Sequence, residues 1–542
     1  MMPGRQRPAD QERDDVAPTG RVRNILFIMC DQLRADYLGC AGHPFQRTPV
    51  IDALARDGVR FERAFCNAPV CGPSRASFYT GRYAISHGAN YNGFPLRVDE
   101  WTIGDHLGGL VGRVALAGKT HMSPDYPGMA RLGIEPGTRA GLAVRQTGFE
   151  PFEHDDGLHP MQNYDPDLPY NRFLREQGYQ SDNPWNDFAN ASMDDDGNVH
   201  SGWYLRNARR AARVREEHSE TAWMTDRAID FITGAGETSF FLHLSYIKPH
   251  WPYMAPAPYH RAYGAGDVIG ANRCDSERDA PNPVLTAFMR HEESRAFSDP
   301  RCRQTVIPTY MGLVEQIDHH LGRLFDAMRA CGRFDDTLIV FTSDHGDFLG
   351  DHWLGEKELF YEEALRIPLV VRDPSPRADA TRGMVRREFV ESIDLLPTFV
   401  EILGGTPNFR LEGRSLVPLL HDSGSPAGWR DAVFAEIDFC MRRARLDLGL
   451  AAHEARGFMV RTDDTKFVYF PRHQPQFFDL AADPLERRDL GPDPAHAGRR
   501  EAMRDRLLEW FALRRNRTTV GDDIIAARTA TAQQRGYLFG VW

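Results

Sequence analysis

Cysteine is scarce in this chain and follows none of the spacings that stabilise small folds. The 542 residues include 8 cysteines, at positions 30, 40, 66, 71, 274, 302, 331 and 440. There is no C-x-x-C pair and no dense, even framework of the kind found in secreted modules, so a disulfide scaffold is excluded as the basis of the fold. We therefore expect reduced thiols and a cytoplasmic location.

Long hydrophobic runs and an excess of positive charge are also missing. No segment approaches the roughly 20 apolar residues that a membrane helix needs, and the polar start, Met1 to Gly20, lacks the apolar stretch of a signal peptide. We expect residues 1–20 to be a disordered lead and the chain to avoid membranes. Its 65 Lys and Arg against 76 Asp and Glu give a net charge of −11, without the basic footprint of a nucleic-acid-binding protein.

What the sequence does contain is a series of short apolar runs that end in polar, chemically capable residues. Four of them are residues 24–30 before Asp31, 114–117 before Lys119, 240–247 before His250, and 337–342 before Asp344. Helical patterns at 49–57, 222–232 and 310–330 separate them. Buried strands that alternate with helices predict an α/β fold with a large, mostly parallel sheet, and functional residues at the carboxyl ends of its strands.

Changes in composition divide the chain into a large and a small domain. Residues 21–412 carry the apolar runs, interrupted at 124–220 by an irregular stretch that we interpret as a lid, with disorder as the alternative. Residues 413–515 contain a hairpin pattern, with runs at 457–461 and 466–470, and a helical pattern at 499–514, which predicts a small antiparallel sheet with a packed helix.

The tail, residues 516–542, ends in the apolar run Tyr537-Leu538-Phe539-Gly540-Val541-Trp542. A chain in water should cover such a patch. We expect the tail to contact a neighbouring subunit of a homo-oligomer, near an active-site entrance. Folding back onto its own subunit is the alternative.

Cys71 begins the most specific motif in the chain. The run Cys71-Gly72-Pro73-Ser74-Arg75 continues with Thr80-Gly81-Arg82 and follows, further upstream, a predicted strand that ends in Asp31-Gln32. A cysteine beside a proline would by itself indicate a small buried hydrophobe. The combination resembles the sulfatase family, and the resemblance extends from about Asn24 to Leu490.

This resemblance implies an alkaline phosphatase-like fold and a modified nucleophile. In sulfatases, C-x-P-x-R is the signal at which a formylglycine-generating enzyme oxidises the cysteine to formylglycine, an aldehyde that hydrates to a diol. The resemblance thus implies that Cys71 becomes formylglycine and that this enzyme is a partner during maturation. Two oxygens on one carbon suit ester cleavage, because one attacks the ester and the other later expels the anion.

Two pairs of adjacent residues at strand ends predict a metal site. Asp31-Gln32 and Asp344-His345 can each turn both side chains toward one ion, although either pair alone would equally fit a helix cap or a turn. With Cys71, they match the sulfatase pattern for one divalent ion. The pairs Asp-Gln and Asp-His at these positions resemble those of phosphonate monoester hydrolases and choline sulfatases, so both Ca²⁺ and Mn²⁺ are candidates for the ion.

Further residues match sulfatase positions that bind or activate the ester, although alone each would indicate an exposed or structural residue. Lys119 and His121 are expected on one face of an extended segment. By resemblance, Lys119 binds the nonbridging oxygens and His121 takes a proton, while His250 and Lys357 assist departure of the alcohol. The resemblance also places Arg75 among the catalytic residues, and Asn92 is a substrate contact in the phosphonate monoester hydrolase pattern.

Other polar clusters are interpreted as structural. The run Asp194-Asp195-Asp196-Gly197 lacks the final carboxylate of a calcium loop and fits a solvated turn. The run Asp318-His319-His320 lies within a helical pattern and fits a satisfied helix face. His243 is assigned to the core or to the surroundings of the site.

Together these features predict a sulfuric ester hydrolase that acts on an aryl sulfate, with promiscuity toward phosphonates. The alternative is phosphonate monoester or phosphodiester hydrolysis with the same nucleophile. Members of that group have Tyr and Thr where this chain has Lys119 and His121, and this difference favours sulfate. A metal-binding scaffold on an inactive hydrolase fold is a third hypothesis, which the complete set of site residues disfavours.

Overall fold

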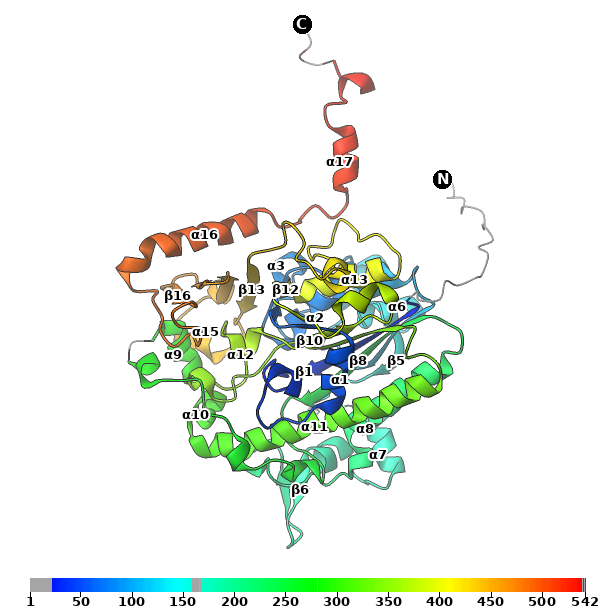
Figure 1. Cartoon of the computed structure of the whole chain (residues 1–542), viewed down its shortest axis with the longest axis vertical. Helices are drawn as coiled ribbons and strands as arrows, with labels where there is room; N and C mark the ends of the chain where they lie inside the picture. Colours follow the sequence, from blue (N-terminus) through cyan, green and yellow to red (C-terminus); the bar gives the residue numbers. More distant parts are fainter. Residues whose placement is uncertain (1–21, 158–164, 166, 280, 539, 541) are drawn as a thin grey trace.

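An eight-stranded sheet forms the centre of the molecule (Figure 1). Its strands are β1 (Asn24–Asp31), β2 (Val59–Phe61), β4 (Arg113–Gly118), β5 (Glu150–His154), β8 (Phe240–Pro249), β9 (Thr337–Ser343), β10 (Leu369–Arg372) and β11 (Val385–Arg386). They lie in the order β11-β2-β10-β9-β1-β8-β4-β5. This computed structural model describes residues 22–157, 165, 167–279, 281–538, 540 and 542, so the predicted disordered lead lies outside the described residues.

Every pair of neighbours within the run β9-β1-β8-β4-β5 is parallel, whereas β10 runs antiparallel to both β9 and β2. The four predicted apolar runs form β1, β4, β8 and β9, which confirms the mostly parallel α/β sheet. Carboxyl ends of parallel strands meet at one edge of a sheet, and polar residues that follow these four strands therefore converge.

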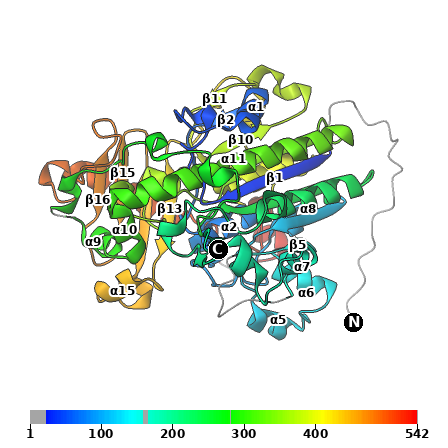
Figure 2. The same cartoon turned by 90° about the horizontal axis from the view of Figure 1, so that it is seen from below.

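Helices cover both faces of the sheet (Figures 1 and 2). The covering helices are α2 (Cys71–Thr80) and α13 (Leu395–Ile402) on one face, and α8 (Glu220–Gly234) and α11 (Pro300–Ala330) on the other. Phe27 of β1 packs against Phe78 of α2 and Phe399 of α13, with ring centroids 5.8 and 5.4 Å apart, whereas its neighbour Ile28 belongs to the core on the other face. Burial on both faces explains why β1 is apolar without alternation.

A smaller antiparallel sheet with one packed helix follows in the chain, as predicted. Its elements are β13 (Val433–Asp438), β14 (Arg456–Arg461), β15 (Thr465–Tyr469), β16 (Gln476–Asp479) and the helix α16 (Ala497–Ala512). The strands pair in sequence order. Trp510 of α16 stacks on Phe434 of β13 with ring centroids 5.2 Å apart, so the helix is packed onto the sheet by aromatic contacts.

The stretch 124–220 contains several short regular elements. They are α5 (Tyr126–Leu132), α6 (Arg139–Arg145), α7 (Pro169–Glu176), β6 (Ala191–Met193) and β7 (Val199–Ser201), besides β5 of the large sheet. Tyr170 meets Trp185 edge to face, with ring centroids 4.6 Å apart. In Figure 1 the segment around β6 projects from the lower end of the molecule.

Remaining elements connect these layers. The other helices are α1 (Pro49–Asp57), α3 (Ala84–His87), α4 (Ile103–Leu107), α9 (Pro283–Met289), α10 (Glu292–Ser298), α12 (Glu362–Leu365), α14 (Val417–His421), α15 (Arg443–Asp447) and α17 (Asp522–Arg528), and β3 (Ala64–Phe65) pairs with β12 (Val390–Glu391). Figure 1 shows α17 projecting away from the body. Within the described residues, no helix has the length and apolar character needed to cross a membrane.

Candidate active site

Four neighbouring strands each deliver a polar residue to the same buried place. Asp31 ends β1, Lys119 follows β4, His250 follows β8 and Asp344 follows β9. All four residues are at most 1% exposed. Gln32, the residue after Asp31, has φ of 67°, so the chain leaves the pleat there and both residues can turn toward the site. The structure therefore shows the convergence of polar residues that was predicted from the strand ends.

Cys71 lies at the centre of this group. It is the first residue of α2, and its Sγ lies 3.1 Å from His345 Nε2 and 3.6 Å from Asp31 Oδ1. The next residue, Gly72, donates its N–H to Asn92 Oδ1 over 2.7 Å, and a Cβ at position 72 would meet that oxygen at 2.9 Å. Asn92 thus lies beside Cys71, and a side chain at position 72 would force the Asn92 amide to shift.

Arg75 holds the two carboxylates rather than pointing at an open space. Its Nε donates to Asp344 Oδ2 over 2.8 Å and its Nη2 to Asp31 Oδ2 over 3.3 Å. Nη1 donates to the Lys119 carbonyl over 2.9 Å and to Ser245 Oγ over 2.7 Å. The guanidinium is completely buried, so these four contacts use it as a rigid support for the site.

The residues around Cys71 fit a divalent metal ion. Ligand atoms of Asp31, Cys71, Asp344 and His345 all lie within 4.8 Å of one another. His345 Nδ1 lies 2.8 Å from the Gly346 carbonyl, which fixes Nε2 as the atom that faces the site. Two carboxylates and an imidazole form a hard-to-borderline donor set, the chemistry that Ca²⁺ or Mn²⁺ accepts.

Gln32 is held from both ends of its amide. Its Nε2 donates to Asp347 Oδ2 over 2.5 Å, and its Oε1 accepts from Lys357 Nζ over 2.8 Å. Tyr253 also donates its hydroxyl to Asp347 Oδ2, over 2.7 Å. These contacts fix the orientation of the Gln32 amide, with its oxygen directed at Lys357.

Lys119 and His121 both reach the site, but the chain does not run extended between them. Lys119 Nζ lies 2.6 Å from Asp31 Oδ2. Asp156 accepts the backbone N–H groups of Thr120 and His121 at 2.9 and 2.8 Å, and His121 has φ of 56°. The expectation of one extended face was therefore wrong, because a carboxylate from another segment turns the chain.

His250 and Lys357 form a contacting pair. Lys357 Nζ lies 3.1 Å from His250 Nε2, and His250 Nδ1 lies 2.8 Å from the Trp251 carbonyl. Burial, together with Lys357, lowers the pKa of His250 to about 4. The imidazole is therefore neutral at pH 7, with Nδ1 donating to the carbonyl and Nε2 accepting from Lys357.

The charges around residue 71 favour an anion. Burial raises the pKa of the Cys71 thiol, but Lys357, His345 and Lys119 outweigh burial and bring it well below its ordinary value. His121 lies close enough to lower it further. A negatively charged group at this position is stabilised by the same cations that would hold an anionic ester.

Comparison with known proteins agrees with this geometry. A family model described as "Sulfatase" matches residues 23–405, and one described as "N-sulphoglucosamine sulphohydrolase, C-terminal" matches residues 350–512. The chain belongs to the sulfatase family. Sulfatases generally use a divalent metal ion and formylglycine, which is consistent with the ligand atoms gathered around Cys71.

Relatives of this sulfatase-family chain include proteins of more than one specificity. It is 33% identical to a "Multifunctional alkaline phosphatase superfamily protein PehA" of Trinickia caryophylli, over 92% of this chain and 96% of that protein. It is 27% identical to an "Arylsulfatase" of Clostridium perfringens, over 93% and 97%. The solved "Phosphonate monoester hydrolase SpPMH from Silicibacter pomeroyi" superposes with a TM-score of 0.80 at 30% identity, covering 91% of this chain and 96% of that one.

Three supporting residues in this sulfatase-family chain were missed by sequence reasoning. Asp347 and Tyr253 orient Gln32, and Asp156 turns the Lys119 to His121 segment. A signal existed for Asp347, which follows Asp344 by three residues in the same loop. None existed for Asp156, because it lies in the irregular stretch whose path the sequence does not specify.

Two residues interpreted as structural, His243 and Asp318, make the contacts of packed and satisfied groups. His243 is buried, stacks on Phe27 with ring centroids 4.6 Å apart and lies 3.0 Å from the Tyr79 hydroxyl. Asp318 accepts the backbone N–H groups of Val50 and Ile51 at the start of α1. These contacts confirm a core histidine and a satisfied helix face.

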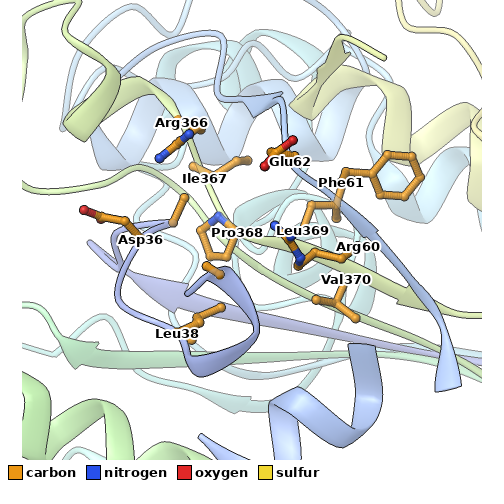
Figure 3. Close-up of a pocket in the computed structure, with 12 residues that line it drawn as sticks. Asp36, Leu38, Arg60, Phe61, Glu62, Arg366, Ile367, Pro368, Leu369 and Val370 are labelled. Carbon is orange, nitrogen blue, oxygen red and sulfur yellow. The ribbon is translucent and has the colours of Figure 1, made fainter. Parts of the chain in front are cut away.

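A separate small pocket carries none of the predicted site residues. Figure 3 shows this cavity of about 50 Å³ between the loop after β1, the strand β2 and the residues that lead into β10. Its charged lining residues include Asp36, Arg60 and Arg366. Without a nucleophile or a ligand cluster among its lining, it is not a candidate for the chemistry described above.

Proposed function

We propose that this protein hydrolyses aryl sulfate esters to an alcohol and inorganic sulfate, with Cys71 converted to formylglycine as the nucleophile. The observation that carries the proposal is the convergence of Cys71, Lys119, Lys357 and His250 on two buried, Arg75-held carboxylates. Such a site combines a nucleophile position with cations for an anionic ester and groups for its departing oxygen.

Each side chain has a role that follows from its place. Lys119, beside Asp31, holds nonbridging oxygens of the ester, and Arg75 keeps Asp31 and Asp344 in position. Lys357 and His250 face the bridging oxygen, where Lys357 stabilises developing negative charge. His121 receives a proton next to residue 71, and Asp344 lies near enough to accept one from the attacking group.

Asp31, Gln32, Asp344 and His345, with residue 71, would hold one divalent ion, Ca²⁺ or Mn²⁺. When bound, such an ion supplies positive charge that aligns the nucleophile and screens the anion. Maturation by a formylglycine-generating enzyme belongs to the same proposal. Residues 124–220 are proposed to cover the site, because Asp156 of that stretch already holds the Lys119 to His121 segment.

Phosphonate monoester hydrolysis is the second candidate. It is favoured by the likeness to the Silicibacter pomeroyi enzyme, which at 30% identity and a TM-score of 0.80 covers nearly all of both chains. Lys119 and His121 argue for sulfate, since they place a cation and a base where that group has neutral hydroxyls. Activity toward both ester types is expected, because the two transition states have similar shape and charge.

The first experiment examines residue 71 directly. Protein produced together with a formylglycine-generating enzyme is digested, and the mass of the peptide that contains position 71 is measured by mass spectrometry. We expect the mass of the aldehyde, and we expect Cys71→Ala and Cys71→Ser to lose about a thousandfold or more in kcat while keeping the thermal melting curve. A thiol at position 71 together with no turnover would support the inactive scaffold instead.

The second experiment separates the two activities. The kcat/KM values for 4-nitrophenyl sulfate and for 4-nitrophenyl phenylphosphonate are measured on the same formylglycine-containing preparation, because the leaving group is identical in the two esters. A higher value for the sulfate supports the proposal. A higher value for the phosphonate would reverse the assignment in favour of the second candidate.

A further inference from the structure

A cavity of about 440 Å³ lies beside the groups assigned to the departing oxygen. This volume is within the range of about 300–1,000 Å³ that is usual for small-molecule pockets. Its lining includes Trp203 and Tyr204 from the segment after β7, Trp251 from the segment after β8, and Glu356 from the loop after β9. One side is formed by α10, which contributes Glu292 and Glu293.

Two lining residues, Trp251 and Glu356, are chain neighbours of His250 and Lys357, the pair assigned to the departing oxygen. Trp251 follows His250, and their ring centroids are 4.4 Å apart. Glu356 precedes Lys357, whose Nζ lies 3.1 Å from His250 Nε2. Because Trp251 both lines the cavity and packs on His250, the alcohol part of an ester whose bridging oxygen faces this pair would extend toward Trp251.

The aromatic walls of the cavity suit a flat ring. Trp203 and Trp251 meet at an interplanar angle of 63° with ring centroids 5.7 Å apart. The indole N–H of Trp203 donates to Asn186 Oδ1 over 3.0 Å, which fixes its orientation. Indole faces bind both aromatic rings and cations, so aromatic walls alone leave the charge of the alcohol part open.

The charged groups of the lining decide that question. Glu293 is paired with Arg442. Within the described part of the chain, the side chains of Glu292 and Glu356 form no hydrogen bond or ion pair, and the lining's one cation, Arg206, is stacked over the exposed Tyr204 ring at 4.6 Å. Burial, supported by Glu293, raises the pKa of Glu356 to about 7 against the effect of Lys357. Glu292 is exposed and carries the unpaired negative charge of the lining, and a cation placed beside Glu356 would favour the ionised form of that carboxyl as well.

We propose that the preferred substrate is an aryl sulfate that carries a positively charged substituent on the far side of its ring. The ring would pack on Trp203 and Trp251, and the cation would face Glu292 and Glu356. This inference rests on the proposed sulfatase function for the ester, whereas the cation preference of the cavity depends only on its own residues.

Two esters matched in size and in the acidity of the phenol test the proposal. They are 4-(2-aminoethyl)phenyl sulfate, which is cationic at pH 7, and 4-(2-hydroxyethyl)phenyl sulfate, which has a neutral substituent. We expect kcat/KM to favour the cationic ester by on the order of tenfold. Equal values, or a preference for the neutral ester, would overturn the inference.

Substitutions in the cavity test whether Glu292 and Glu356 cause the preference for the cationic ester. In Glu292→Gln/Glu356→Gln, the ratio of the two kcat/KM values should fall close to one, with the neutral ester changed by no more than about twofold. The exposed Glu292→Gln alone should lower the ratio in part, and provides a readout should the double variant fold poorly. The control Glu401→Gln, an exposed change outside the cavity, should leave the ratio unchanged. A ratio that survives the double substitution would refute the assignment.

A binding measurement separates this inference from the proposed function. Calorimetry on Cys71→Ala compares 4-(2-aminoethyl)phenol with 4-(2-hydroxyethyl)phenol, the alcohols without their sulfate. Tighter binding of the amine, lost in the variant that also carries Glu292→Gln/Glu356→Gln, supports the cavity preference even if sulfate esters prove not to be substrates. Equal binding of the two alcohols would refute it even if aryl sulfates are hydrolysed.

Discussion

Lys357 and His250 come from loops that follow different strands, yet Lys357 Nζ lies 3.1 Å from His250 Nε2. Burial and the lysine together lower the pKa of His250 to about 4, so the imidazole is neutral at pH 7 and accepts a hydrogen bond from the ammonium group. In the proposed function the two residues would act as one unit, with His250 orienting the cation toward the oxygen on which negative charge builds.

Replacing Lys357 should therefore slow the reaction most for esters of phenols with a high pKa, which are poor leaving groups. For Lys357→Ala we expect kcat to fall by about 10²–10³ with alkyl-substituted phenyl sulfates, the usual cost of one lost oxyanion donor, and by much less with 4-nitrophenyl sulfate. The measurement is a plot of log kcat/KM against the pKa of the phenol, which should become steeper. A uniform loss across the series would place Lys357 elsewhere in the mechanism.

Metal removal should abolish activity. Prolonged chelation should lower the rate by about a thousandfold or more, because the nucleophile and the anion both lose their alignment, and added Ca²⁺ or Mn²⁺ should restore it. Asp344→Ala should lose metal and rate together, while the control Asp505→Ala, an exposed position, keeps both. Elemental analysis provides the readout, and full activity in verified metal-free protein would contradict the assignment.

Much of this site could be predicted because its residues follow strands. Asp31 and Asp344 end apolar runs that are buried on both faces, and parallel strands bring such ends to one edge whatever the intervening sequence. Cys71 was found through a motif, since its spacing to Pro73 and Arg75 is local. Both kinds of signal are carried by short stretches of sequence.

Contacts made across the fold could not be predicted in this way. Asp156 holds the backbone of Thr120 and His121 from 35 or more residues away, and no periodicity encodes such a pairing. The motif predicts a catalytic role for Arg75, which stays a prediction, but it did not predict that the buried guanidinium binds Asp31 and Asp344. Its role as a support depends on which atoms it meets, information that only three-dimensional packing contains.

Lys119 and His121 should set the balance between ester types. Changing them together to Tyr and Thr removes a cation and a base, so we expect kcat/KM for 4-nitrophenyl sulfate to fall more than kcat/KM for 4-nitrophenyl phenylphosphonate. The ratio of the two values measured on one preparation is independent of the fraction of active enzyme. An unchanged ratio would remove the basis for preferring sulfate.

Because of His352, the free energy of unfolding should decrease as the pH rises from neutral to alkaline values. Its Nδ1 lies 2.6 Å from Glu277 Oε1, and although burial lowers its pKa, Glu363 and Glu277 raise that pKa to about 10. Unfolded histidine titrates near pH 6.5. Stability from the protonated imidazole is therefore fully present below about pH 6.5 and is lost as pH rises through 10.

Urea unfolding of His352→Gln tests this relationship. Against the parent protein, we expect a loss of about 3–5 kcal/mol at pH 6, typical of breaking a buried ion pair, and a difference that shrinks steadily toward pH 10. The control His453→Gln, at an exposed position, should differ little from the parent at every pH. A difference for His352→Gln that does not vary with pH would show that the imidazole contributes by packing alone.

The C-terminal tail is proposed to hold two subunits together. In Figure 1 α17 stands away from the body of its own subunit, and Tyr537 and Leu538 are 66% and 63% exposed. Contact with a second copy of the chain would cover these apolar side chains and so stabilise the oligomer. We expect protein truncated after Thr519 to sediment as a smaller species than the full chain, and the milder Tyr537→Ser/Leu538→Ser to shift the association equilibrium the same way. Survival of the oligomer with unchanged affinity in the truncated protein would show that the tail does not hold it together.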